Sequence, residues 1–486
     1  MVRSRKGMSF VATIKIGWGQ TDITPIGKIG KKVSVCGQFH ERITSDVHDP
    51  LHAVAMVVEN DEGVCAAIVS LDLALTSDKM MDLARAKLAE RLPEFPARSL
   101  ILAATHTHTA PDFREIGEGY LGESIGFYCK DPDVIRPEAY LDFLTGQIAE
   151  AVASAWHARA PGGLAFRVGR VAVPHCRRVR YKDGSAAMYG NTDTERFLRV
   201  EGNADNGVEY VFAYDSAGQL TGALINLACP AQVLESKYFL SADIWGAVRA
   251  QWTECPYLVT LCGAAGDITM RDLVRRYRME APMNDVAGMN DQAGRIVRES
   301  RYTLSTVKPD DIQFDLTVKH LVRHIMLPIS TVTDEQLIAA KAFRDNLNRE
   351  YELNGTAAES PDSIPLLLKD RYPYYQATAT IKRHAFQQQS RAVNMELHAL
   401  RLGPSVLVTN SFELYQDYGM QIKARSPFAQ IIIAQLACGH RGYLSTDYAL
   451  SGGGYGSVVV SGYCGPEGGQ VLVEKTMEAI RQLQDA

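Results

Sequence analysis

The sequence lacks a long apolar run, a strong net charge and the cysteine spacing of a structural scaffold. No stretch approaches about 18 consecutive apolar residues, so we expect no stable membrane insertion. The formal net charge of -5 gives no electrostatic basis for binding nucleic acid or an anionic membrane. The nine cysteines include no Cys-X-X-Cys pair, and their odd number fits reduced thiols. We therefore expect a cytoplasmic protein whose partner is a small molecule.

A secretory signal and internal repeats are also missing. Residues 8–16 are too short an apolar stretch, and too interrupted by Thr13 and Lys15, for a signal peptide. What remains is ordinary for a globular protein: 486 residues, 46% hydrophobic and 22% charged. That length predicts one large or two fused α/β units, and it leaves a homo-oligomer open.

Short apolar segments alternate with amphipathic ones along the chain, which predicts an α/β fold. Ser77 or Asp78 is placed to begin a helix that ends before Pro93. We expect strands at 53–58, 66–71, 99–103, 222–228 and 257–261, and helices at 78–91, 140–157, 333–353 and 475–483. Several of these strands end in polar residues, where open α/β sheets bind ligands. The Gly/Ser/Pro-rich stretch 354–362 predicts a flexible loop or subdomain junction.

The most informative run is 104–111, Ala-Thr-His-Thr-His-Thr-Ala-Pro, which follows the strand expected at 99–103. Two histidines two apart on an extended backbone point to the same face, roughly 6–7 Å apart. At that distance, one of the two histidines, His106 or His108, can bind a metal while the other acts on the reacting group of the substrate. The alternative is a pair of polar side chains satisfied at the end of a strand.

Eight motifs, this run among them, occur in the order in which the neutral (non-lysosomal) ceramidases carry them. The others are residues 17–25, 69–73, 191–193, 241–243, 266–269, 411–413 with Gly419, and 442–446. The chain therefore resembles that family from about residue 15 to 460. The resemblance implies a large α/β catalytic domain over residues 1–486, a mixed sheet flanked by helices. Because the sequence ends soon after the last motif, we expect no C-terminal immunoglobulin-like domain.

The resemblance also implies one catalytic zinc per chain, with His106, Glu413 and Tyr443 as ligands. The fourth position is a histidine before proline in the ceramidases and is Cys229 here. A thiolate binds zinc at about 2.3 Å, so Cys229 could replace the imidazole. In the alternative Cys229 is an ordinary buried cysteine, the ligand is lost, and Glu235 or Asp243 supplies an oxygen.

Further roles follow from the same resemblance. His108 acts as a general acid or base, or donates to the tetrahedral intermediate. Arg177, with Tyr443 or Tyr455, stabilises an oxyanion. Thr269 stands at the position of the ceramidase active-site serine. For Arg177 taken alone, a solvated salt bridge is the alternative.

Two carboxylates, Asp243 and Asp267, follow expected strands and are interpreted as groups that orient the ligands. The glycine run 452–456 is interpreted as a wall of the pocket rather than a phosphate loop.

These residues predict a zinc-dependent hydrolase that cleaves an amide bond with metal-activated water. Thr269, the Arg177–Arg178 pair and the aromatic run 372–375 favour a small soluble substrate over ceramide. Three alternatives stay open: a true ceramidase, a metal-free hydrolase with Cys229 as nucleophile, and a non-catalytic binding protein.

Overall fold

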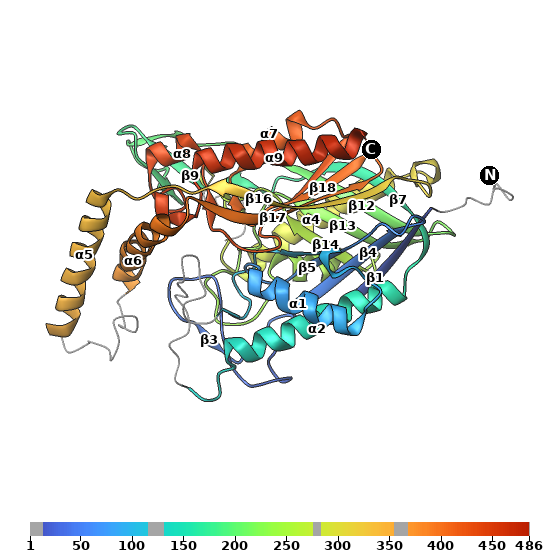
Figure 1. The fold of residues 1–486 in the computed structure, drawn as a ribbon, viewed down its shortest axis with the longest axis horizontal. Coiled ribbons are helices and arrows are strands. Elements are labelled where there is room, and N and C mark those ends of the chain that lie inside the picture. The colour runs from blue at the N-terminus through green and yellow to red at the C-terminus, as the bar shows by residue number, and fades with distance from the viewer. Residues whose placement is uncertain (1–12, 115–130, 276–282, 354–367, 486) are drawn as a thin grey trace.

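Two mixed β-sheets surround the main hydrophobic core, and the long helices lie on the outside (Figure 1). The structure is a computed structural model that describes residues 13–114, 131–275, 283–353 and 368–485. The larger sheet has the spatial order β14 (Leu258–Cys262), β13 (Leu220–Leu227), β12 (Gly207–Asp215), β7 (Ala160–Arg170), β1 (Ile14–Asp22), β4 (His52–Asn60), β5 (Cys65–Leu71) and β6 (Leu100–Ala104). The smaller sheet has the order β16 (Val318–Pro328), β17 (Ala392–Leu402), β18 (Ser405–Thr409) and β20 (Gln430–Ala434).

Short strands and helices complete the described part. The short strands are β2 (Val33–Ser34), β3 (Ile43–Thr44), β8 (His175–Cys176), β9 (Arg178–Tyr181), β10 (Ala186–Met188), β11 (Phe197–Val200), β15 (Ile268–Thr269), β19 (Glu413–Leu414) and β21 (Tyr443–Leu444). The α-helices are α1 (Asp78–Arg91), α2 (Pro137–His157), α3 (Ile244–Gln251), α4 (Val286–Ser305), α5 (Asp334–Leu353), α6 (Leu368–Gln389), α7 (Gln416–Arg425), α8 (Asp447–Gly452) and α9 (Pro466–Asp485). Three single turns are 3-10 helices: η1 (Ala97–Ser99), η3 (Pro309–Asp311) and η5 (Val459–Ser461).

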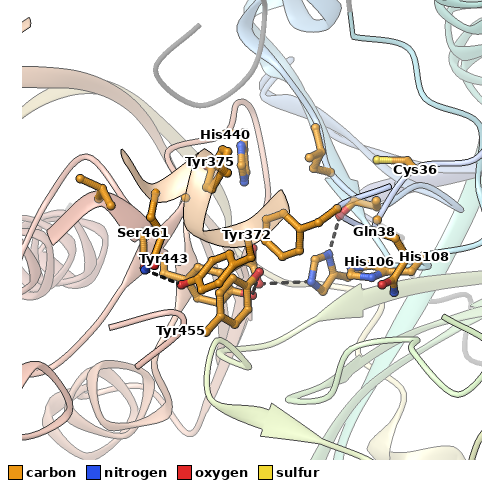
Figure 2. Close-up of a pocket in the computed structure, with 18 of the residues that line it drawn as sticks. Cys36, Gln38, His106, His108, Tyr372, Tyr375, His440, Tyr443, Tyr455 and Ser461 are labelled. Atoms are coloured by element: carbon orange, nitrogen blue, oxygen red, sulfur yellow. Dashed lines mark hydrogen bonds and ion pairs between the residues drawn. The ribbon is translucent and has the colours of Figure 1, made fainter. Parts of the chain in front are cut away.

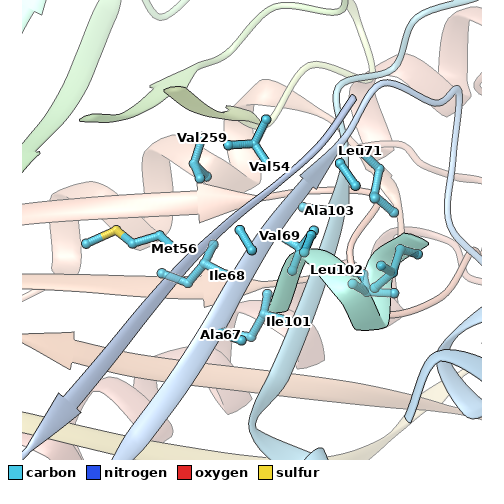
Figure 3. Packing of buried hydrophobic residues seen from close by; sticks show 14 of the residues in the cluster. Val54, Met56, Ala67, Ile68, Val69, Leu71, Ile101, Leu102, Ala103 and Val259 are labelled. Carbon is cyan, nitrogen blue, oxygen red and sulfur yellow. The ribbon is translucent and has the colours of Figure 1, made fainter. Parts of the chain in front are cut away.

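The larger sheet bends where β1 and β7 meet, because only two residues of each strand pair there. Its edge strands β14 and β6 consequently approach each other, and β20 of the smaller sheet contacts β12, β13 and β14. One apolar cluster joins both sheets and includes Ile68, Leu102, Leu407 and Ile432. Figure 3 shows Val259 of β14 beside Val54 of β4 within this cluster.

In the two large sheets, each parallel strand pair is joined by a helix: β5–α1–β6, β13–α3–β14 and β18–α7–β20. Parallel neighbours need such a crossover, because a tight turn reverses the chain. The motifs of the sequence follow the carboxyl ends of these strands, His106 after β6, Cys229 after β13 and Glu413 after β18. The crossovers therefore gather segments that are far apart in the sequence at one edge of the sheets.

The expected mixed sheet flanked by helices is confirmed. The helix expected at 78–91 has the predicted bounds, and Ser77 begins it by accepting a hydrogen bond from the Met80 N–H at 3.1 Å. The helix expected at 475–483 is longer and forms the end of α9. The loop expected at 354–362 lies outside the described residues. No helix in the described ranges is long and apolar enough to cross a bilayer.

One backbone expectation is wrong. The sequence predicted an extended chain through the His-X-His run, but β6 ends at Ala104 and His106 has φ 66°, in the left-handed region. The two imidazoles consequently meet edge to face, with ring centroids 4.8 Å apart and planes at 86°. Thr105 and Thr107, on either side of His106, still donate backbone hydrogen bonds to Leu71 and Leu73 after β6 has ended.

Candidate active site

A pocket with a cavity volume of about 130 Å³ lies at the edge where the motif segments meet. Figure 2 shows His106 and His108 reaching it from one side and Tyr443 and Tyr455 from the other. Glu413 also lines this active-site pocket. The structure therefore brings together three of the four predicted metal ligands and two of the predicted catalytic residues.

His106 is buried and held by one backbone contact. Its Nδ1 lies 2.5 Å from the carbonyl oxygen of Ala74, and a carbonyl only accepts, so Nδ1 carries the proton. The other ring nitrogen, Nε2, lies 3.3 Å from Oε2 of Glu413 and makes no hydrogen bond. A buried lone pair that faces a carboxylate needs a proton or a cation between the two atoms.

Glu413 and Tyr443 are positioned by the same short ladder, since they face each other across the parallel strands β19 and β21. The Tyr443 hydroxyl donates a hydrogen bond to the Glu413 carboxylate. Burial opposes ionisation of Glu413, but the adjacent His106 ring, helped by Arg177, holds the pKa of Glu413 below its ordinary value. Burial, then the charge of Glu413, raises the pKa of Tyr443.

Arg177 lies behind this group and is 3% exposed, which excludes the solvated salt bridge considered above. Its Nη2 donates to the Gly266 carbonyl at 2.9 Å and to the Tyr443 hydroxyl at 3.3 Å. The same guanidinium lies 3.9 Å from the Glu413 carboxylate. Asp267 fixes the backbone of this residue, because its carbonyl accepts the Arg177 N–H at 2.8 Å.

His108 is enclosed by polar groups of the segment that follows β13. Its Nε2 lies 2.7 Å from the Gln232 amide nitrogen, and its Nδ1 lies 4.0 Å from Glu235. Gly37 permits this packing, since a Cβ there would stand 2.5 Å from Cγ of the His108 ring. Burial and the positive charges around it, His106 first among them, lower the pKa of His108 well below its ordinary value. The ring is therefore neutral, and its Nε2 accepts a hydrogen bond from the Gln232 amide.

Five predicted residues are not among the side chains that line the pocket: Arg177, which lies behind it, and Cys229, Thr269, Asp243 and Asp267. Cys229 is fully buried in an apolar cluster, and burial raises the pKa of its thiol well above the ordinary value. Within the described ranges it does not join His106 and Glu413 in a group whose ligand atoms all lie within 4.8 Å of one another. Thr269 lies on β15, and its hydroxyl accepts the Arg271 N–H at 3.2 Å.

The two remaining carboxylates act on the backbone. Asp243 accepts the N–H groups of Val233 and Leu234, so it holds the segment that carries Gln232 and Glu235. Asp267 accepts the N–H of Gln416 at 2.8 Å. Burial raises the pKa of both carboxyl groups to about 6. Glu235, the alternative oxygen ligand, is paired with Arg271 at 2.8 Å.

Sequence reasoning missed several lining residues. Gln38 and Phe39 enter from the loop between β2 and β3, and Arg114 and His440 enter from other loops. Burial lowers the pKa of His440 to about 4. The sequence did carry a signal for His440, a histidine in a glycine-rich turn three residues before Tyr443. The loop between β2 and β3 has no sequence pattern that indicates a place in the pocket.

A second group of potential ligands in the described part of the chain lies away from this pocket and consists of Glu396, His398 and Cys438. Arg85 donates to both carboxylate oxygens of Glu396, at 2.9 and 2.6 Å. His398 donates to the same carboxylate at 2.7 Å. The lone pairs that a metal would need are thus engaged, and the group is a buried ion-pair network.

No protein-family model matches the chain, and no curated protein sequence matches it either. Solved structures do. Neutral ceramidase from Pseudomonas aeruginosa superposes with a TM-score of 0.69 at 15% identity, covering 97% of this chain and 75% of that one. A structure described as ceramidase complexed with C2 gives 0.68 at 14% identity, covering 98% and 76%.

The chain has the neutral ceramidase fold. The resemblance inferred from the motifs is confirmed at the level of fold over nearly the whole chain. At this identity the neutral ceramidase fold alone does not assign an activity, because one fold hosts many functions. The residues of the pocket carry the functional argument.

Proposed function

We propose that the chain is a metal-dependent hydrolase of neutral ceramidase type that cleaves an amide bond in a small soluble substrate. One observation carries the proposal. The buried Nε2 of His106 faces the Glu413 carboxylate at 3.3 Å without a hydrogen bond, and Tyr443 donates to the same carboxylate. An imidazole, a carboxylate and a phenol converging on one point fit a divalent cation.

The donor set favours zinc, about one per chain, held by His106, Glu413 and Tyr443 with Cys229 as the predicted fourth ligand. The Ala74 carbonyl supports this assignment, because a ligating histidine usually donates its other N–H to such an acceptor. Bound there, zinc would act as a Lewis acid that polarises a carbonyl and lowers the pKa of water towards neutrality.

The residues around this point supply the proton transfer and the charge stabilisation. His108, neutral and beside His106, accepts a proton from the attacking water and returns it to the leaving amine. Arg177 and the Tyr455 hydroxyl donate to the substrate oxygen as it gains negative charge. Thr269 acts indirectly in this proposal, since β15 pairs with β8 immediately before Arg177.

The substrate is proposed to be small because the cavity volume is about 130 Å³. An engineered cavity of about 150 Å³ holds one benzene molecule, so this pocket has room for only a small part of a sphingolipid. A true ceramidase is therefore the second candidate, favoured by the fold. No observation favours a Cys229 nucleophile, whose raised pKa keeps it a thiol. Cytoplasmic location and a homo-oligomer stay predictions.

Elemental analysis together with amidase assays tests the proposal. Purified protein should contain about one zinc per chain and lose amide hydrolysis on treatment with a chelator. His106→Asn should lose both metal and activity. His384→Asn, on α6 outside the pocket, is the matched control and should keep both. Metal-free protein with full amidase activity would overturn the proposal.

A further inference from the structure

A second cavity adjoins the active-site pocket between α5 and α6, which lie at one end of the molecule (Figure 1). We name it the α5–α6 groove; its volume is about 430 Å³. Most of its lining is apolar, including Ala339, Ala340 and Phe343 of α5 and Pro373 and Ala377 of α6. Its size falls in the range of cavities that bind small molecules, about 300–1,000 Å³.

Three residues line both cavities: Gln376, Val458 and Val460. These three residues are therefore the boundary that the two cavities share. Gln376 is fixed in that boundary, because its amide nitrogen donates to the Tyr372 hydroxyl at 2.8 Å, one helical turn away on α6.

Tyr372 is itself held by aromatic packing inside the active-site pocket. Its ring contacts Phe39 and Tyr455 edge to face, with centroids 5.1 and 5.3 Å apart. Figure 2 shows Tyr372 between the histidines and the Tyr443–Tyr455 pair. Each such aromatic contact is worth about 0.5–1.5 kcal/mol beyond burial, so the ring keeps its place and presents a fixed acceptor to Gln376.

We infer that Gln376, Val458 and Val460 form a partition that limits the size of the substrate group the active-site pocket accepts. This inference rests on the proposed amide hydrolase function. With the partition closed, the pocket admits a group about the size of benzene or a short acyl chain. With the partition removed, a linear apolar chain passes from the pocket into the α5–α6 groove.

A homologous series of linear N-acyl-4-nitroanilides, from acetyl to decanoyl, measures this limit. For the wild type, kcat/KM should fall at least about tenfold once the acyl chain exceeds the pocket. In Gln376→Ala, the ratio of octanoyl to acetyl kcat/KM should rise at least about tenfold, because added methylenes are then buried in the groove. Tyr372→Phe keeps the ring and removes the acceptor of Gln376, so it should raise the same ratio by less.

Gln388→Ala is the matched control, since Gln388 is exposed on the same helix and lines neither cavity. It should leave the ratio unchanged. An unchanged ratio in both Gln376→Ala and Tyr372→Phe, with hydrolysis intact, would overturn the partition and leave the proposed function standing.

Calorimetric titration with linear primary amides, from acetamide to decanamide, gives a readout without turnover. The longer amides should bind more tightly to Gln376→Ala than to the wild type. If that shift appears while no nitroanilide is hydrolysed, the partition holds and the proposed function fails. If no amide binds to any variant, the partition is overturned.

Discussion

Substitution of Arg177 tests stabilisation of the negative charge on the substrate oxygen separately from the other parts of the proposed mechanism. Its planar guanidinium donates through Nη2 to Gly266 and Tyr443 and through Nη1 to the Tyr189 hydroxyl, a two-nitrogen geometry that a lysine ammonium cannot reproduce. Arg177→Lys should therefore lower kcat for amide hydrolysis by about 10²–10³ with little change in KM. Arg196→Lys, at an exposed ion pair, should leave both constants unchanged. A rise in KM alone would assign Arg177 to substrate binding instead.

Cys229 as the fourth ligand stays a prediction that cobalt substitution can test. A thiolate bound to cobalt gives a charge-transfer band, which wild-type protein should show and Cys229→Ser should lose. Cys255→Ser, another buried cysteine, should retain it. The burial that raises the pKa of the Cys229 thiol opposes ligation, so a metal must displace its proton. Absence of the band in the wild type would leave three protein ligands.

Individual residues were predictable where a short motif carries the chemistry. His106, Glu413 and Tyr443 were identified from the sequence and converge in the pocket. Phe39 and Arg114 were not, because they come from loops whose paths depend on contacts far away in the chain. The same reason explains the error at His106, whose left-handed backbone is imposed by the turn after β6.

The β16–β17 pair contains a half-buried histidine, His320, that should make the protein sensitive to acid. Burial, and then the charge of His398, lowers the pKa of His320 to about 3 from an ordinary value of 6.5. As pH falls below 6.5 the unfolded chain takes up this proton and the folded protein does not, so the free energy of unfolding falls until pH approaches 3. Urea unfolding across this interval should show the decline.

His320→Gln should make that pH dependence less steep by the contribution of one proton, because glutamine does not titrate whereas His52 and His440, with pKa values of about 4, still do. His157→Gln, at an exposed position on α2, should leave it steep. Burial works against ionisation of Glu396, but His398 and Arg85 hold the pKa of Glu396 at about 2. The stabilisation that the lowered pKa of Glu396 gives is lost only below pH 4.5, its ordinary pKa. The decline in the free energy of unfolding above pH 4.5 therefore does not come from Glu396. An equally steep curve for His320→Gln would contradict the assignment.

The five strands and four helices expected from the sequence are present, but β1, β7, β12 and the four strands of the smaller sheet were not predicted, and neither was strand pairing. The period of apolar residues marks each segment, and Ser77 marks the start of α1. Nothing in the sequence of β1 or β7 indicates that they pair over only two residues and bend the larger sheet there. Strand order depends on side chains that meet from distant parts of the chain, which local patterns do not encode.

The two sheets share one core and should unfold together. Leu102 of β6 is fully buried between them, and its carbonyl accepts the Cys438 N–H at 2.9 Å. Leu102→Ala should lower the free energy of unfolding by about 2–5 kcal/mol, measured in urea. Leu198→Ala, at a position 53% exposed, should change it little. Fluorescence and circular dichroism should give coincident transitions, and separate transitions would show that the sheets unfold independently.

The left-handed backbone at His106 lowers the stability of the fold at a residue that is a predicted metal ligand. A side chain in that region costs roughly 1–2 kcal/mol, and asparagine tolerates it better than histidine. His106→Asn should therefore match or exceed the metal-free wild type in thermal midpoint, since bound metal would stabilise only the wild type. A lower midpoint would show that packing of the imidazole outweighs the backbone cost. If the midpoint matches or rises as expected, selection for heat resistance alone would favour variants that have lost catalysis.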